Sequence, residues 1–293
     1  MEIPAASGVP PGSGKKTNFL ASQLYLTNRN IMGSSSIEER FKFAHTLVQE
    51  AGDLALDYFR RLDTLRVHRK GPQDMASEAD LNTELLIRNR LKERFPEDAF
   101  LGEETGRTDF AADQGIWVVD PIDGTQPFIS GLTGWCVSIA FMLRGVLEIG
   151  LITSPARGEL FAAQHGVGAT LNGQDIHISA ATRLTEGIVG VGYSPRVKPD
   201  EFLRLFSRLL NQGAMFYRDG SGALTLCYVA CGRLIGYVEP HINSWDCLAA
   251  LAIIQAAGGT ISDFLSNDGL WKGNRLIAGP PSLYPTLSQL FDV

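Results

Sequence analysis

The segment from Trp135 to Ile178 constrains the fold more than any other part of the chain. Short runs of β-branched and aromatic residues are broken there by Arg144-Gly145, Arg157-Gly158 and Asn172-Gly173. Pairs of this kind favour the tight turns that join neighbouring antiparallel strands. The pattern therefore predicts an antiparallel meander in the middle of the chain.

Two helices and two short strands are predicted before the meander. Ser36-x-x-Glu39 is a capping box, and the apolar residues after it recur at spacings of three and four, so an amphipathic helix is expected up to about Arg60. A second helix is expected from about Ser77 until just before Pro96. It should turn three leucines inward: Leu81, Leu85 and Leu86. Short buried strands are expected at 99–102 and 116–119.

After the meander, strands and helices are expected to alternate. The predicted strands are 188–191, 214–217 and 234–238, and the predicted helices are 199–212, 221–231 and 245–258. This change of pattern predicts two lobes, an N-terminal α+β lobe at 37–180 and a C-terminal α/β lobe at 181–293. Residues 1–36 are rich in Gly, Pro, Ser and Asn, which predicts a flexible N-terminal extension without chemistry of its own.

Composition and charge exclude several classes of protein. Of the 293 residues, 44% are hydrophobic and 20% are charged, which excludes a wholly disordered chain. The 26 basic and 32 acidic residues give a formal charge of -6, which argues against nucleic acid or an anionic membrane as the main partner. The longest apolar run is much shorter than a membrane span, and the four cysteines form no CxxC pair. A cytoplasmic enzyme is therefore expected.

The most informative motif is Asp120-Pro-Ile-Asp123-Gly124-Thr125, which follows the apolar run Trp117-Val-Val. A turn at the end of such a strand can point both carboxylates and the Ile122 carbonyl at one spot, as hard divalent cations require. A helix that begins at Gly124 or Thr125 would add free N–H groups that can hold a phosphate. Pro, Asp and Gly are also common in ordinary surface turns, so the motif alone leaves both interpretations open.

Three other acidic positions extend this motif. Gly102-Glu103-Glu104 follows an expected buried strand, Asp80 stands at the start of an expected helix, and Asp246 precedes a very apolar helix. Each has an ordinary structural explanation, namely an exposed loop pair, a first-turn acid favoured by the helix dipole, and an N-cap. Only their joint occurrence favours a cluster of metal ligands.

Together these positions resemble the inositol monophosphatase family of magnesium-dependent, lithium-sensitive phosphatases. The matching pieces are Asp74-Met-Ala-Ser77-Glu-Ala-Asp80, Gly102-Glu103-Glu104, Asp120-Pro-Ile-Asp123-Gly124-Thr125, and Trp245-Asp246 followed by Ala256-Ala257-Gly258-Gly259. They occur in the family's order and at its spacing, over about Ile37 to the end of the chain. The resemblance implies a layered αβαβα sandwich, a phosphoric monoester hydrolase that acts on a small-molecule phosphate ester, and a homodimer.

The resemblance also implies two or three Mg²⁺ ions as cofactors. Glu103, Asp120 and the Ile122 carbonyl would hold one ion, and Asp120, Asp123 and Asp246 a second. A third would lie near Glu103, with Glu104 and Asp80 in its surroundings. Mg²⁺ lowers the pKa of a bound water, and two close metal ions can stabilise an in-line displacement at phosphorus. Thr125 and Asp80 would orient that water, so the implied catalytic residues are Thr125, Asp80, Glu103 and Asp123.

The implied substrate residues lie on both sides of Asp246. Glu239 stands seven residues before Asp246, at the position of a family glutamate that contacts substrate hydroxyls. Gly220-Ser221-Gly222-Ala223 resembles a family segment that lines the same pocket, with Gly222 in place of an alanine. Gly124, Thr125 and Asp246 itself would complete the implied substrate contacts.

Two departures from the family pattern leave the substrate open. Pro127 stands where an asparagine is usual, which removes an amide and a backbone donor beside the site. Asp219 precedes the pocket glycine and could pair with a cationic substrate. Inositol monophosphate is therefore the first expectation, with histidinol phosphate as an alternative, followed by other sugar phosphates or nucleotide bisphosphates. A relative without catalytic activity that binds a metal or a partner protein is a further alternative.

Overall fold

The computed structural model describes residues 36–65, 67–71, 74–109, 111 and 113–292, and it divides into two units, Met1–Arg40 and Phe41–Val293. Within the first unit, Ser36 N donates to Glu39 Oε2 at 2.9 Å and Glu39 N donates to Ser36 Oγ at 3.1 Å. The predicted capping box is therefore confirmed. The predicted extension over 1–36 lies outside the described residues except for Ser36, and the lobe boundary near residue 180 stays a prediction.

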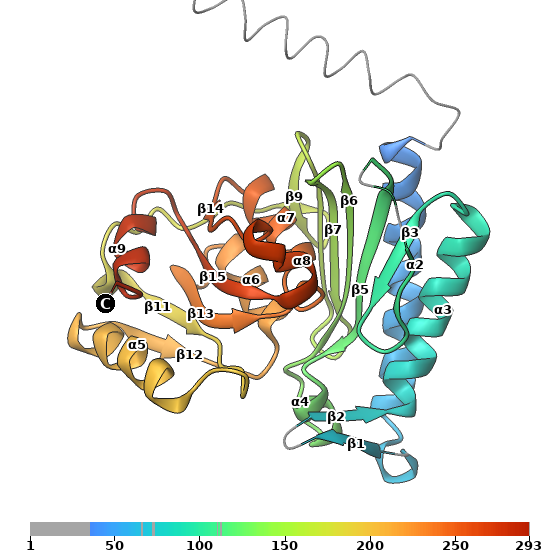
Figure 1. Cartoon of the computed structure of the whole chain (residues 1–293), viewed down its shortest axis with the longest axis horizontal. Coiled ribbons are helices and arrows are strands. Elements are labelled where there is room, and N and C mark those ends of the chain that lie inside the picture. The colour runs from blue at the N-terminus through green and yellow to red at the C-terminus, as the bar shows by residue number, and fades with distance from the viewer. Residues whose placement is uncertain (1–35, 66, 72–73, 110, 112, 293) are drawn as a thin grey trace, which may run out of the picture. The chain divides into compact units, whose positions relative to one another are not determined.

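An eight-stranded sheet is built around the predicted meander (Figure 1). Its order is β10-β9-β8-β7-β6-β5-β3-β4, and only the pair of β3 and β5 is parallel. The strands are β3 (Ala99–Gly102), β4 (Gly106–Arg107), β5 (Gly115–Asp123), β6 (Cys136–Leu143), β7 (Val146–Ser154), β8 (Glu159–Gln164), β9 (Gly168–Leu171) and β10 (Gln174–Asp175). The turn residues Arg144 and Gly145 both have positive φ, at 52° and 78°, as a two-residue hairpin turn requires.

A second sheet has five strands in the order β12-β11-β13-β15-β14. Its strands are β11 (Ile188–Val191), β12 (Met215–Tyr217), β13 (Gly236–Ile242), β14 (Thr260–Ile261) and β15 (Asn274–Gly279). The pairs of β11 with β12 and β13 are parallel, as strands joined through helices should be, and the pairs that involve β15 are antiparallel. A separate antiparallel hairpin is formed by β1 (Val67–Gly71) and β2 (Asp74–Ser77).

Helices cover both sheets. The helices are α2 (Ile37–Phe59), α3 (Glu78–Arg94), α4 (Thr125–Ile129), α5 (Pro199–Asn211), α6 (Gly222–Ala230), α7 (Leu248–Ala256), α8 (Gly269–Lys272) and α9 (Tyr284–Gln289), with 3₁₀ turns at Leu62–Thr64, Leu184–Glu186 and Ser266–Asp268. Within the second unit, α3 and the part of α2 from Phe41 onward lie against one face of the eight-stranded sheet, and α6 and α7 lie between the two sheets (Figure 1). Helices α5 and α9 pack on the other side of the five-stranded sheet. The predicted layered αβαβα arrangement is confirmed.

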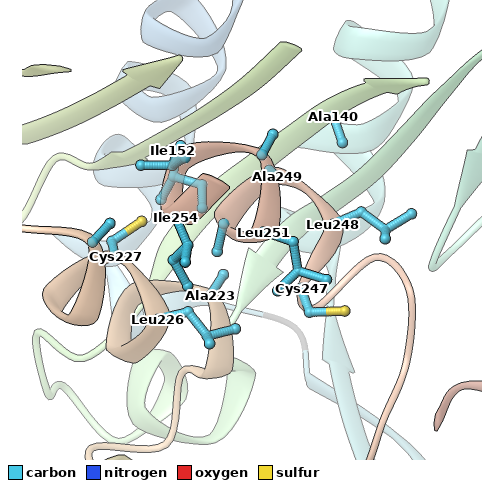
Figure 2. Close-up of a cluster of buried hydrophobic side chains, with 14 of the residues drawn as sticks. Ala140, Ile152, Ala223, Leu226, Cys227, Cys247, Leu248, Ala249, Leu251 and Ile254 are labelled. Carbon is cyan, nitrogen blue, oxygen red and sulfur yellow. The ribbon is translucent and has the colours of Figure 1, made fainter. Parts of the chain in front are cut away.

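The core is centred on α6 and α7, which are apolar around their whole circumference and are therefore buried on all sides. Figure 2 shows side chains of both helices beside Ala140 and Ile152 of the eight-stranded sheet. Gly150 of β7 lets α7 approach closely, because a Cβ atom there would lie 2.2 Å from the Ala249 carbonyl oxygen. Among the described residues, no helix combines the length and apolarity needed to cross a membrane.

Helix α3 has the predicted bounds but not the predicted buried face. Leu81 is 44% exposed, whereas Asp80 and Glu84 are fully buried with Ile87. The prediction that Leu81 faces inward was therefore wrong, and Leu85 and Leu86 are only partly buried. The physical reason is that the two buried carboxylates accept hydrogen bonds from neighbouring segments, which offsets the cost of removing them from water.

Candidate metal centre

Asp120 and Asp123 lie at the end of β5, where the strand is irregular. The predicted strand ended at Val119, but β5 continues to Asp123. Asp120 lies opposite Ser138 and Asp123 lies opposite Cys136, so β5 uses three residues where β6 uses two. Side chains three apart on a regular strand point to opposite faces. The extra residue cancels this alternation and turns both carboxylates to the same face of the sheet.

Glu103, Asp120 and Asp246 converge on one spot. Each offers a carboxylate oxygen, and the three oxygens lie within 4.8 Å of one another. They come from the end of β3, the end of β5 and the turn before α7, which are far apart in sequence. Three of the predicted acids therefore lie together, in a group that combines members of both implied ligand sets, and their role as metal ligands stays a prediction.

Asp246 reaches the cluster because the chain turns before α7 begins. The helix was expected from Trp245, but it starts at Leu248, and Cys247 has a non-helical backbone with φ −137°. Asp246 Oδ2 accepts hydrogen bonds from Asn243 N at 3.2 Å and Asn243 Nδ2 at 3.0 Å. The alternative that Asp246 is an ordinary N-cap is therefore wrong, since its carboxylate bonds to the preceding loop rather than to the helix.

Glu84 holds the loop that carries Glu103, a role that sequence reasoning missed. Its Oε2 accepts from Glu104 N at 2.8 Å, and its Oε1 accepts from Thr105 N at 2.6 Å. A Cβ atom on Gly102 would lie 2.4 Å from the Glu84 carboxyl carbon, so only glycine leaves room for this contact. The available signal was the spacing of four between Asp80 and Glu84, which places both acids on one face of α3.

We expect Glu84→Gln to weaken Mg²⁺ binding at least tenfold. The amide keeps one acceptor oxygen but places an NH₂ group against a backbone N–H, so the loop loses one of its two anchors. Outer groups that orient metal ligands typically change metal affinity by about 10–100-fold. Calorimetric titration with Mg²⁺ measures the effect, with Glu93→Gln on the exposed side of the same helix as the matched control. An unchanged dissociation constant in folded Glu84→Gln would refute this role.

Asp123 is anchored at the N-terminus of α6. Its Oδ2 accepts hydrogen bonds from Ser221 Oγ at 2.5 Å and from Ala223 N at 2.6 Å. Ser221 also caps α6, because its Oγ accepts from Leu224 N at 3.1 Å. One carboxylate oxygen of Asp123 is thus used in joining β5 to α6, and its charge still acts on Asp120.

Thr125 and Asp80 are joined as the sequence predicted for a catalytic pair. The Thr125 hydroxyl lies 3.2 Å from Asp80 Oδ1 and 3.2 Å from the Ile122 carbonyl oxygen, and can donate to either. Asp80 Oδ2 accepts from Ser77 N at 2.8 Å and from Ser77 Oγ at 2.5 Å. This capping box fixes Asp80 at the start of α3, so Oδ1 remains directed at Thr125. The assigned catalytic roles stay predictions.

The electrostatics of the cluster favour a bound cation. Burial raises the pKa of Asp120 well above its usual range, and the charges of Glu103, Asp123 and Asp246 raise it further. Burial and the charge of Asp246 raise the pKa of Asp123 to about 7. The donors are all carboxylate oxygens, the ligand type that Mg²⁺ prefers over nitrogen or sulfur. The residues present therefore fit Mg²⁺.

A cavity of about 170 Å³ adjoins the cluster. It is lined by Asp123, by the predicted substrate residue Asp246 and by four others of that set, Gly220, Ser221, Gly222 and Glu239. Tyr237 donates its hydroxyl hydrogen to Glu239 Oε2 at 2.6 Å, and burial raises the pKa of Glu239 to about 8. A buried carboxyl group of this kind can exchange hydrogen bonds with hydroxyl groups of a ligand. Five of the seven predicted substrate residues thus line one cavity, whereas Gly124 and Thr125 do not, and the roles of all seven stay predictions.

Comparison with known proteins identifies the family. The family model described as "Inositol monophosphatase family" matches residues 36–292. The chain belongs to the inositol monophosphatase family. It is 34% identical over 245 residues to the Nus factor SuhB of Pseudomonas aeruginosa, covering 82% of this chain and 90% of that protein.

Solved structures agree with this assignment. The extragenic suppressor protein suhB of Bartonella henselae superposes with a TM-score of 0.80 at 30% identity, covering 86% of this chain and 97% of the other. The inositol monophosphatase of Anabaena superposes with a TM-score of 0.75 at 28% identity, covering 86% and 95%. Family membership therefore extends over all four motifs found in the sequence.

One departure from the family pattern has a packing explanation. Gly220 has φ +99°, and a Cβ atom there would lie 2.6 Å from Pro127 Cγ. The proline ring of α4 thus packs directly against the backbone of the pocket glycine. Pro127 therefore makes an apolar contact that restrains the position of Gly220, at the place where the resemblance implies an asparagine.

The other departure is Asp219, and the interpretation that it could pair with a cationic substrate was wrong. Asp219 Oδ2 forms an ion pair with Arg157 at 3.2 Å and accepts from Tyr217 Oη at 3.0 Å. Its Oδ1 accepts from Ser221 N at 3.3 Å and from Thr225 Oγ1 at 3.1 Å. Both oxygens are therefore used in bracing the start of α6. Asp219 has no oxygen left to pair with a cationic substrate, because a charged residue of the protein already fills that place.

Proposed function

We propose that the protein is a Mg²⁺-dependent phosphomonoesterase that hydrolyses a small polyol phosphate, with inositol monophosphate as the first candidate. The observation that carries the proposal is the convergence of Glu103, Asp120 and Asp246 beside a cavity lined by Glu239. Family membership supports the same reaction class. The chain retains all four proposed acidic ligands, which argues against the alternative of a family member without catalytic activity.

The residues of the chain divide the work between metal and substrate. Glu103, Asp120, Asp123, Asp246 and the Ile122 carbonyl are the proposed Mg²⁺ ligands, for two or three ions. Bound Mg²⁺ would activate the attacking water and neutralise charge on the phosphoryl group. Thr125, held by Asp80, orients that water from the start of α4, next to Gly124. On the substrate side, Glu239 and the segment Gly220-Ser221-Gly222 contact the alcohol portion.

A phosphate-release assay tests the proposal directly. Inositol 1-phosphate and histidinol phosphate are compared side by side in Mg²⁺ and in EDTA. We expect release from inositol 1-phosphate that depends on Mg²⁺, and slower release from histidinol phosphate because Asp219 is engaged by Arg157. Absence of Mg²⁺-dependent release from either ester and from other sugar or nucleotide phosphates would refute the proposal.

Lithium should inhibit the enzyme at millimolar concentration. The expectation rests on the family resemblance, in which Li⁺ occupies one of the Mg²⁺ positions. Turnover is measured with increasing LiCl against matched NaCl, which controls for ionic strength. Unchanged turnover at tens of millimolar Li⁺ would contradict it.

A second candidate function comes from the relatives called Nus factor SuhB. That name favours a protein with a partner-binding role in place of, or beside, catalysis. Co-purification of a partner protein together with undetectable phosphate release would support this alternative. A cytoplasmic homodimer also remains part of the proposal, and gel filtration with light scattering measures the oligomeric state.

A further inference from the structure

Two arginines line the cavity that adjoins the acidic cluster. Arg196 lies in the loop after β11, and Arg218 lies between β12 and α6. The charge of Arg196 acts on Asp246 and the charge of Arg218 acts on Glu239, so both guanidinium groups are electrostatically coupled to the site. The cavity therefore presents positive charge as well as carboxylates.

Both arginines are available to a ligand. In the part of the chain that the structure describes, neither guanidinium makes an ion pair or a hydrogen bond to another protein group. Arg157 and Arg233, which lie outside the cavity, are instead paired with Asp219 and Glu159. The nearest acid in sequence to Arg218 is thus engaged elsewhere. Arg196 and Arg218 are both exposed at the cavity, where an incoming molecule can reach them.

We propose that Arg196 and Arg218 form a subsite for a second anionic group, a phosphate or a carboxylate, on the alcohol portion, so that esters carrying such a group bind more tightly than inositol monophosphate. The inference rests on the proposed function, because the acidic cluster and its Mg²⁺ take the phosphate that is hydrolysed. Phosphate and carboxylate groups both present a pair of acceptor oxygens, which a guanidinium group can bind through two parallel hydrogen bonds.

The same charges disfavour a cationic alcohol. A protonated amine that entered the cavity would meet two guanidinium groups, while Asp219 is already engaged. Once Mg²⁺ neutralises Asp123 and Asp246, Glu239 is the remaining acid among the cavity-lining residues, against two arginines. An anionic substituent on the alcohol therefore gains attraction at the position where an amine is repelled.

Matched ester pairs test the proposal. Glycerol 2-phosphate and 2-phosphoglycerate differ by a carboxylate, and fructose 1-phosphate and fructose 1,6-bisphosphate differ by a second phosphate. We expect KM to be at least tenfold lower for the more anionic member of one pair, and the pair that shows it identifies the anion. Arg196→Gln and Arg218→Gln should each reduce this preference to threefold or less. Arg204→Gln, an exposed arginine on α5 outside the cavity, is the control and should retain it.

A preference of less than threefold in both pairs, or a preference that survives both substitutions, would overturn the anion site. Calorimetric binding of the same esters to the Mg²⁺-loaded protein keeps this test separate from catalysis. Binding preference without any phosphate release would refute the proposed function and support the anion site. Release without a preference would refute the anion site and support the proposed function.

Discussion

Asp123→Asn is expected to reduce Mg²⁺-dependent phosphate release to below a tenth of the parent value. Asp123 is a proposed Mg²⁺ ligand, and its charge acts on Asp120 within the same cluster. An amide cannot supply that charge, so the cluster attracts a divalent cation less strongly. The loss should appear in kcat and in the Mg²⁺ concentration needed for half-maximal activity.

The fold should survive this substitution. The asparagine oxygen can still accept the hydrogen bonds that Asp123 Oδ2 takes from Ser221 and Ala223. Circular dichroism and the unfolding midpoint check this point. Asp175→Asn, an exposed acid on β10, is the matched control and should retain full activity. Activity of Asp123→Asn above a tenth of the parent, with an intact fold, would contradict the assignment of Asp123 as a ligand.

In EDTA, the protein should lose stability as the pH rises from about 5 to 8, and Mg²⁺ should reverse most of the loss. The pKa values of Asp123 and Glu239 are raised to about 7 and about 8 in the folded protein. In the unfolded chain they return to about 4. The folded state therefore binds more protons than the unfolded state across this range. Its free energy of unfolding falls as the pH rises and these protons leave.

The expected loss is up to about 7 kcal/mol, because one pKa unit corresponds to about 1.4 kcal/mol and, between pH 5 and 8, Asp123 contributes about two units and Glu239 about three. In a chain of this size such a loss lowers the unfolding midpoint by roughly 10–20 °C. The proposed Mg²⁺ site requires ionised carboxylates, so the stabilising effect of Mg²⁺ should be larger at pH 8 than at pH 5. Thermal unfolding between pH 5 and 8, with EDTA and with Mg²⁺, measures both trends.

A substitution identifies the source of the slope. Asp120→Asn removes a carboxyl group whose own pKa is raised by burial and by the charges of Glu103, Asp123 and Asp246, so it should lessen the pH dependence in EDTA and weaken stabilisation by Mg²⁺. Asp175→Asn should change neither. A midpoint in EDTA that stays constant or rises between pH 6 and 8 would show that burial and the neighbouring charges do not raise the pKa values of these acids.

Local patterns predicted most of the elements. The turn pairs of the meander, the apolar periodicity of α2 and the glycine at the end of α6 depend on a few neighbouring residues, and the structure confirms them. The acidic motifs were also found from sequence, because their order and spacing resemble those of the family whose model matches residues 36–292. Strand ends were predicted less well, since β5 and β13 both continue through irregular residues at which the local sequence pattern predicts the end of the strand.

The buried face of α3 shows the limit of this reasoning. Leucine was expected inside and acid outside, yet Glu84 is buried and Leu81 is exposed. Hydrophobicity ranks side chains by their transfer from water, but a carboxylate that accepts two backbone hydrogen bonds is stable inside. Its partners lie 20 and 21 residues away, so no window along the helix reveals them.

The sequence alone determined the order of elements and the acidic residues that are candidate Mg²⁺ ligands, because backbone preference and ligand chemistry are properties of single residues and their neighbours. The tertiary structure decided which charges remain available. It paired Asp219 with Arg157 and left Arg218 at the cavity. Which charged residues form pairs depends on the distances between their side chains, and the packing of the two sheets and their helices sets these distances. The spacing of the residues along the chain does not give them.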